Sequence, residues 1–119
     1  MRFVATLALA ITAVSAIPAV AQERAVRLAH DAIGNGDFAS AERRLIAEQR
    51  IYPNNSEVML NLAAVYAGTG RQAQAASLYR QVLAQRDVLM DLDAERSQSA
   101  HAIAQTGLER LDIQMTAAR

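Results

Sequence analysis

Cysteine is absent from the chain, which excludes disulfides and thiolate metal sites and leaves packing as the source of stability. An excess of either charge is absent as well, because 12 basic residues, all arginine, balance 12 carboxylates. Such a chain has no long-range attraction for nucleic acid or for an anionic membrane. The sequence also lacks the G-x-S-x-G, H-E-x-x-H and phosphate-loop motifs, and neither of its histidines, His30 and His101, has further metal ligands placed near it. We therefore expect a protein that is not an enzyme, holds no metal or cofactor and binds no nucleic acid.

The N-terminal segment has the plan of a secretory signal peptide. Arg2 is followed by an apolar stretch of about 14 residues, 3–16, and Ala19 and Ala21 place small side chains where a signal peptidase requires them. We predict a signal peptide at residues 1–21, cleaved after Ala21, and a mature protein in the periplasm or outside the cell. The apolar run is shorter than the ~20 residues that span a bilayer. An uncleaved anchor is therefore the less favoured alternative, and no membrane span is expected after cleavage.

The remaining residues, 22–119, are enough for one domain and carry a formal net charge of −1, because removing Arg2 leaves 11 arginines against 12 carboxylates. Within this domain, small and apolar residues recur at a spacing of 34. The coinciding pairs are Leu28 and Leu62, Ala29 and Ala63, Gly36 and Gly70, Ala41 and Ala75, and Leu45 and Tyr79. Repetition at this period is typical of stacked helix pairs.

Each unit carries the signals of two helices and of the turns that end them. In the first unit, the glycine-rich residues 34–36 stop the first helix, and Tyr52 stops the second because a residue before proline avoids the helical region. One of the residues 54–56 then caps the next helix. The second unit repeats this plan, with a glycine stop at residues 68–70 and a second helix that ends near Arg86.

Two alanines, Ala41 and Ala75, occupy the same position in the two units. We predict that they lie at equivalent helix crossings, where small side chains let the helix axes approach to about 8–9 Å.

The order Leu-Ala, Gly, Ala, an aromatic or leucine, and Pro-Asn-Asn, with two helices per 34 residues, resembles the tetratricopeptide repeat. The resemblance implies an all-α superhelix with one repeat at residues 22–55 and a second at residues 56–89. The sequence departs from the family pattern at Glu48, where a small residue is usual. This carboxylate has to reach solvent or pair, for example with Arg44 one turn earlier.

The last third of the chain no longer follows the repeat. Apolar residues alternate along residues 88–92, which favours a short extended segment. Residues 91–95 have the early spacing of a calcium loop, but Arg96 replaces the glycine that such a loop needs and Ala102 replaces its glutamate. We therefore interpret these carboxylates as a solvated approach to the next helix.

Stacked helix pairs leave their last apolar face bare, so the terminal unit needs a cap. We predict a capping helix at residues 97–111, started by Ser97 or Ser99, and a flexible tail at residues 112–119. Gly107 falls inside this helix, where it either costs about 1 kcal/mol relative to alanine or ends the helix.

In the tetratricopeptide family, the first helices of successive repeats line a concave face, so the resemblance implies a binding groove. The equivalent positions here are Val26, Arg27, His30, Ile33, Leu60, Asn61, Ala64 and Ala67. Val26 and His30 stand where a lysine and an asparagine of the family's carboxylate clamp would be, so capture of a C-terminal carboxylate is not implied. The resemblance instead implies binding of a peptide segment or a partner subunit. The alternative is a structural component whose stacked repeats self-associate into a homo-oligomer.

Overall fold

The computed structural model describes residues 31–93 and 96–117. The predicted signal peptide and the predicted groove positions Val26, Arg27 and His30 lie outside the described residues. The described chain begins with a helical turn at residues 31–34 and continues through α2 (Phe38–Ile51), α3 (Ser56–Gly68), α4 (Gln72–Ala84), β1 (Leu89–Asp93), β2 (Arg96–Ser99) and α5 (Ala100–Ala117).

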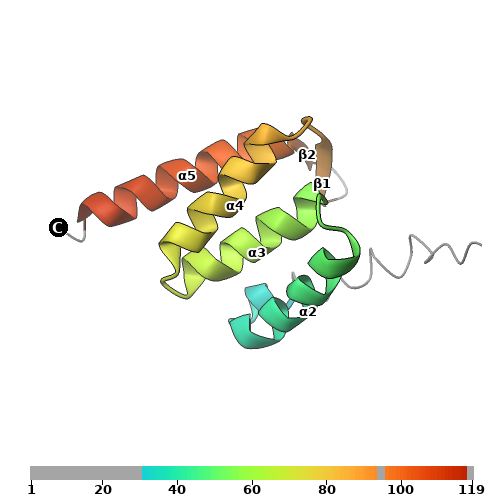
Figure 1. The fold of residues 1–119 in the computed structure, drawn as a ribbon. Helices are drawn as coiled ribbons and strands as arrows, with labels where there is room; N and C mark the ends of the chain where they lie inside the picture. Colours follow the sequence, from blue (N-terminus) through green and yellow to red (C-terminus); the bar gives the residue numbers. More distant parts are fainter. Residues whose placement is uncertain (1–30, 94–95, 118–119) are drawn as a thin grey trace, which may run out of the picture.

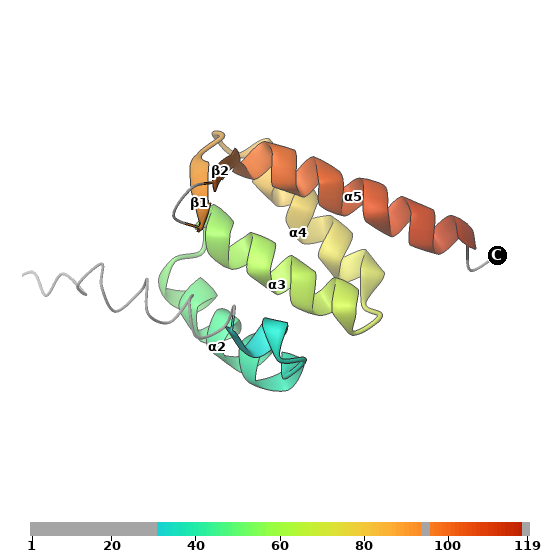
Figure 2. The ribbon, with the colours of Figure 1, turned by 180° about the vertical axis from the view of Figure 1, so that it is seen from behind.

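The helices pack in the order of the sequence, each against the one before it (Figure 1). Helix α3 is central, because it contacts α2, α4 and α5, and the view from behind again places it between α2 and the pair α4–α5 (Figure 2). The two strands form an antiparallel pair at one end of the helices. The prediction of a mostly helical fold is confirmed, and the strand pair is an addition to it.

The two glycine stops are the same turn made twice. Gly36 and Gly70 have φ angles of 76° and 78°, which side chains with a Cβ atom rarely adopt. Each glycine N–H donates to the carbonyl three residues earlier, at 3.0 Å and 3.4 Å, and the N–H of the following residue donates to the carbonyl five residues earlier, at 2.8 Å in both turns. This pair of bonds is the Schellman motif, which satisfies carbonyls that a helix end leaves free.

The proline stop and the cap that follows it also form as local signals predict. Helix α2 ends at Ile51, one residue before its C-cap Tyr52 and two before Pro53. Of the three candidate caps for α3, Asn55 takes the role, because its side-chain oxygen accepts the N–H of Val58 at 3.0 Å. Such a cap typically contributes about 1 kcal/mol.

Ala41 and Ala75 are both buried, with no exposed surface, in one continuous core. The largest fully buried side chains of this core come from α2, α3 and α4, and they are Leu45, Val58, Met59, Leu62, Val65 and Val82. The apolar stripes of the two units therefore meet in a single core.

The C-terminal helix is longer than predicted and starts later. Residues 97–99 do not belong to it, because they pair with β1, with Leu89 opposite Ser99 and Met90 opposite Gln98. The predicted tail is helical to Ala117, because no glycine or proline follows Gly107 and Leu111 anchors the helix in the core. Both bounds of the predicted cap, 97–111, are thus corrected, and α5 passes through Gly107 without a break.

Two side chains cap the first turn of α5. The Ser99 hydroxyl accepts the N–H of Ala102 at 3.0 Å, and the Asp87 carboxylate accepts the N–H of His101 at 3.0 Å. This backbone hydrogen bond is the main reason why the pKa of Asp87 lies below its usual value. The His101 ring adds a bond between its Nε2 and the carbonyl of Gln85 at 2.8 Å, in which Nε2–H must donate because a carbonyl only accepts.

Candidate functional site

Four of the predicted groove residues lie together in the structure. Leu60, Asn61, Ala64 and Ala67 follow one another along one side of α3, where they line an open groove of about 520 Å³. Ile33 is half-buried against the core and does not line this groove, because the helical turn that carries it ends at Gly34, away from α5. The groove is therefore formed between α3 and a wall that the repeat alone does not predict.

Helix α5 supplies that second wall. Its contributing residues recur every three or four positions, as expected for one helix face, and they are Ile103, Thr106, Gly107, Arg110, Leu111 and Gln114. Both α3 and α5 start near the strand pair and run away from it in the same direction (Figures 1 and 2). Sequence reasoning missed this wall because the inserted hairpin moves α5 out of the 34-residue register, although the helical spacing of these residues was visible.

The strand pair lines the groove at the end where α3 and α5 begin. Met90 and Leu92 of β1 and Gln98 of β2 contribute to the lining there. The alternation seen along residues 88–92 thus corresponds to a real strand whose alternate residues face the groove. Leu92 remains 47% exposed, so an apolar contact is available at this end.

Tyr79 of α4 contributes the aromatic part of the lining and lies against Gly107 of α5. A Cβ atom placed on Gly107 would lie only 2.3 Å from Cζ of the Tyr79 ring, so the two helices approach closely because position 107 has no side chain. Tyr79 is 7% exposed. Burial raises the pKa of its hydroxyl, because a phenolate loses hydration there, and the nearby positive charge of Arg110 partly counteracts this rise.

A second hollow, of about 870 Å³, lies between the start of α3, the end of α4 and β1. Its lining is more polar and includes Asn54, Glu57, Arg86 and Asp91, while Met90 lines both hollows. None of the predicted groove positions within the described residues lines it.

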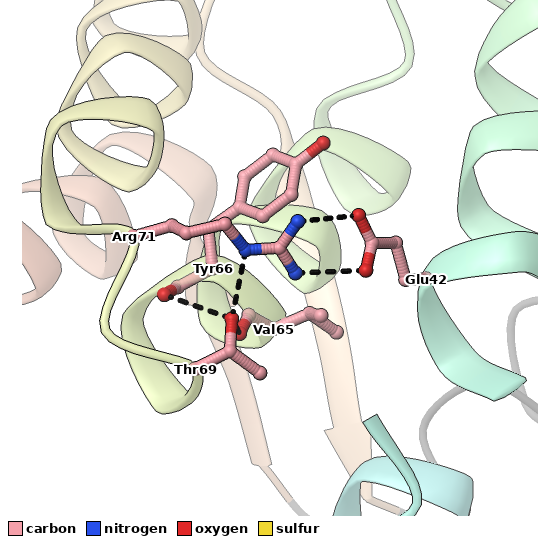
Figure 3. Close-up of polar contacts among 5 residues, drawn as sticks. All are labelled: Glu42, Val65, Tyr66, Thr69 and Arg71. Atoms are coloured by element: carbon pink, nitrogen blue, oxygen red, sulfur yellow. Dashed lines mark hydrogen bonds and ion pairs between the residues drawn. The ribbon is translucent and has the colours of Figure 1, made fainter. Parts of the chain in front are cut away.

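A charged cluster outside the groove joins α2 to the turn before α4 (Figure 3). Arg71 donates from both terminal nitrogens to the Glu42 carboxylate, at 2.6 Å and 2.7 Å, and its Nε donates to the Thr69 hydroxyl at 3.1 Å. The guanidinium also lies 4.5 Å from the ring centroid of Tyr66. The hydrogen bonds from Arg71 are the main reason why the pKa of Glu42 is lowered. The polar groups of this cluster bind one another, so the cluster connects α2 to the turn before α4 and is not a candidate ligand site.

Glu48 is half-buried, and within the described ranges its Oε2 atom has no hydrogen-bond partner. The predicted partner Arg44 is exposed, and no ion pair between the two side chains is present in the described structure. Among the same residues, no group of three or more histidine, aspartate or glutamate side chains is arranged to hold a metal ion. In residues 31–93 and 96–117, no helix combines the length and the apolar character that crossing a bilayer requires.

Comparison of the chain with protein-family models gave no match. Comparisons with curated proteins and with solved structures gave no significant match either.

Proposed function

We propose that the protein is a non-catalytic interaction module of the cell envelope, built on the plan of a tetratricopeptide superhelix. It binds a peptide segment, or a segment of a partner subunit, in the groove between α3 and α5. The predicted signal peptide at residues 1–21 directs it to the periplasm or beyond.

The observation that carries this proposal is the groove itself. Its lining is mostly apolar with a few polar side chains, the mixture that is typical of binding sites for organic ligands and peptides. Four residues of α3 that line the groove occupy positions that the resemblance to the repeat family implies for binding. Its other wall, α5, is held firmly at its start by the caps from Asp87 and Ser99.

A groove-blocking variant tests the proposal. Ala64 is half-buried on the groove side of α3, so Ala64→Arg places a long side chain across the groove. Ala73→Arg is the matched control, because Ala73 is exposed on α4 and does not line the groove. Circular dichroism spectra of both variants establish that the fold is kept.

The probe is a random peptide display library panned on the immobilised protein. We expect enriched sequences that bind the wild type and the Ala73→Arg variant and are lost on Ala64→Arg. Failure to enrich any sequence, or enriched peptides that bind the Ala64→Arg variant equally well, would refute binding in this groove.

Self-association is the second candidate, and two side chains near the end of α5 favour it. Ile113 and Met115 are 68% and 49% exposed, so contact with a second copy at this end of α5 would remove apolar surface from water. Sedimentation velocity over a wide concentration range decides between the candidates. A monomer at all concentrations removes self-association, whereas an oligomer that Ile113→Ser and Met115→Ser dissociate supports it.

A further inference from the structure

Among the described residues that line the groove between α3 and α5, Arg110 is the one charged side chain. Arg110 is exposed, and no described carboxylate forms an ion pair with it. Its own helix offers none either, because the residues three and four positions away are Thr106, Gly107, Ile113 and Gln114. A guanidinium that pairs with no described carboxylate, in a groove whose described lining is otherwise uncharged, attracts an anionic group of the groove's occupant.

The position of Arg110 places its charge over the groove and not merely at the surface of α5. Its charge acts on the hydroxyl of Tyr79, which also lines the groove. Gln114 lies one turn beyond Arg110 and still lines the groove. The groove therefore continues past the guanidinium in the direction away from the strands.

The described polar lining also includes the hydroxyl of Thr106 and three amide side chains. They are Asn61 of α3, Gln98 of β2 and Gln114 of α5, and none of them is hydrogen-bonded to another residue in the part of the chain that the structure describes. An amide side chain both donates and accepts, so it matches the N–H and C=O groups of an extended main chain. A helix would not use these amides in this way, because it satisfies its own backbone groups.

We propose that the occupant of this groove is an extended, mainly apolar peptide segment that carries an aspartate or glutamate side chain opposite Arg110. This inference rests on the proposed function and specifies the ligand class of the same groove. The anion is a side chain and not a chain terminus, because the lining continues through Gln114 beyond the guanidinium. The apolar positions of the segment contact Leu60, Ile103 and Leu92, while its main chain pairs with the amides.

Defined peptide pools test this specificity by fluorescence anisotropy. Each pool consists of labelled nine-residue peptides, blocked at both ends, with alanine, valine, leucine and serine randomised around a central residue. That central residue is glutamate, glutamine or lysine in the three main pools. A fourth pool has central glutamine and a free C-terminal carboxylate.

We expect the glutamate pool to bind the wild type roughly three- to tenfold more tightly than the glutamine pool, and the lysine pool to bind most weakly. The advantage of glutamate should shrink as salt is raised, because the pair lies near solvent. It should disappear in Arg110→Gln and persist in Arg80→Gln, where an exposed arginine of α4 outside the groove is replaced. Equal unfolding temperatures of both variants and the wild type establish that folding is unchanged.

Other outcomes separate this inference from the proposed function. If the pools bind equally, or if the preference for glutamate survives Arg110→Gln, the acidic ligand class is wrong while peptide binding stands. If the pool with the free C-terminal carboxylate binds most tightly, the anion is a chain terminus and the inference is overturned. If no pool binds and the display library also yields nothing, the proposed function itself fails.

Discussion

Replacing Gly107 by alanine puts a methyl group where the ring of Tyr79 already lies. The new Cβ atom would lie 2.3 Å from Cζ and 2.6 Å from each Cε atom of that ring. Non-bonded carbon atoms prefer a separation of about 3.5–4.0 Å, so the ring or the helix has to move by more than about 1 Å. Tyr79 is only 7% exposed, which prevents the ring from turning out into solvent. The substitution therefore forces α4 and α5 apart.

Two opposing effects set the magnitude. Alanine in place of glycine inside a helix gains about 1 kcal/mol of helix propensity. Overpacking of a close contact costs about 1–3 kcal/mol. We expect Gly107→Ala to lower the free energy of unfolding by about 1 kcal/mol, which corresponds to a fall of about 4–8 °C in Tm for a domain of this size.

Two other glycines serve as controls in the same thermal and urea unfolding experiments. Gly34 lies in a helical turn with nothing within 4 Å of an added Cβ atom, so Gly34→Ala should stabilise the protein by up to about 1 kcal/mol. A Cβ atom added to Gly68 would lie 2.8 Å from Cζ of Phe38, but that ring is only half-buried and can yield, so the effect of Gly68→Ala should be intermediate. Because helix propensity is common to the series, the difference between Gly107→Ala and Gly34→Ala measures the overpacking, about 1–3 kcal/mol.

The ring itself is tested by a double variant. In a Tyr79→Leu background the aromatic ring is gone, so Gly107→Ala should become neutral or stabilising there. If Gly107→Ala raises Tm in the wild type as much as Gly34→Ala does, Tyr79 does not press against α5. The close contact between Tyr79 and Gly107, which forms part of the groove lining, would then be absent from the protein.

Other substitutions probe the core and the ionisable groups. Ala75→Leu should lower the free energy of unfolding, measured in urea, by about 1–3 kcal/mol, because Ala75 is buried. The control Ala73→Leu, on the exposed side of α4, should change it by less than about 0.5 kcal/mol. Equal effects of the two substitutions would contradict the burial of Ala75. Because folding raises the pKa of Tyr79, its contribution to stability is complete below about pH 10 and is lost as pH rises through the folded-state pKa. The chain has no lysine or cysteine that titrates in this range, so Tyr79→Phe should flatten the alkaline fall of Tm, and an unchanged profile would exclude this cause. Arg71 lowers the pKa of Glu42 in the folded protein. The stability that the ionised Glu42 carboxylate contributes is therefore present above about pH 4.3 and is lost as pH falls through the lower folded-state pKa. Glu42→Gln should therefore reduce the acid sensitivity of Tm, and Arg71→Gln should reproduce that change if the pair is responsible.

Local signals were sufficient to predict the helix ends of the two units. The glycine stops at Gly36 and Gly70, the stop before Pro53 and the cap by Asn55 all form where they were expected. Each of these depends on backbone conformation and hydrogen bonds within five residues along the chain, so the information is contained in a short stretch of sequence.

The bounds of α5 were not predictable in the same way. Ser99 fits the start of a helix and also the end of a strand, and only its pairing with Leu89 assigns residues 96–99 to β2. The sequence left open whether Gly107 lies within the last helix or ends it; α5 continues through Gly107, and the missing side chain there allows close contact with Tyr79. The charged contact between Glu42 and Arg71 likewise joins residues 29 positions apart, which no local pattern indicates.

The amino-acid sequence by itself determined the 34-residue register, the turns that end the described helices of the two units, and the face of α3 that carries Leu60, Asn61, Ala64 and Ala67. Only the tertiary structure decided what lies opposite that face, because the strand pair shifts α5 along the chain and the Tyr79–Gly107 contact sets how closely it packs. Backbone preferences act over a few residues and can be recognised in sequence. The meeting of two helix faces depends on how side chains from distant segments fit together, and that is settled only when the chain has folded.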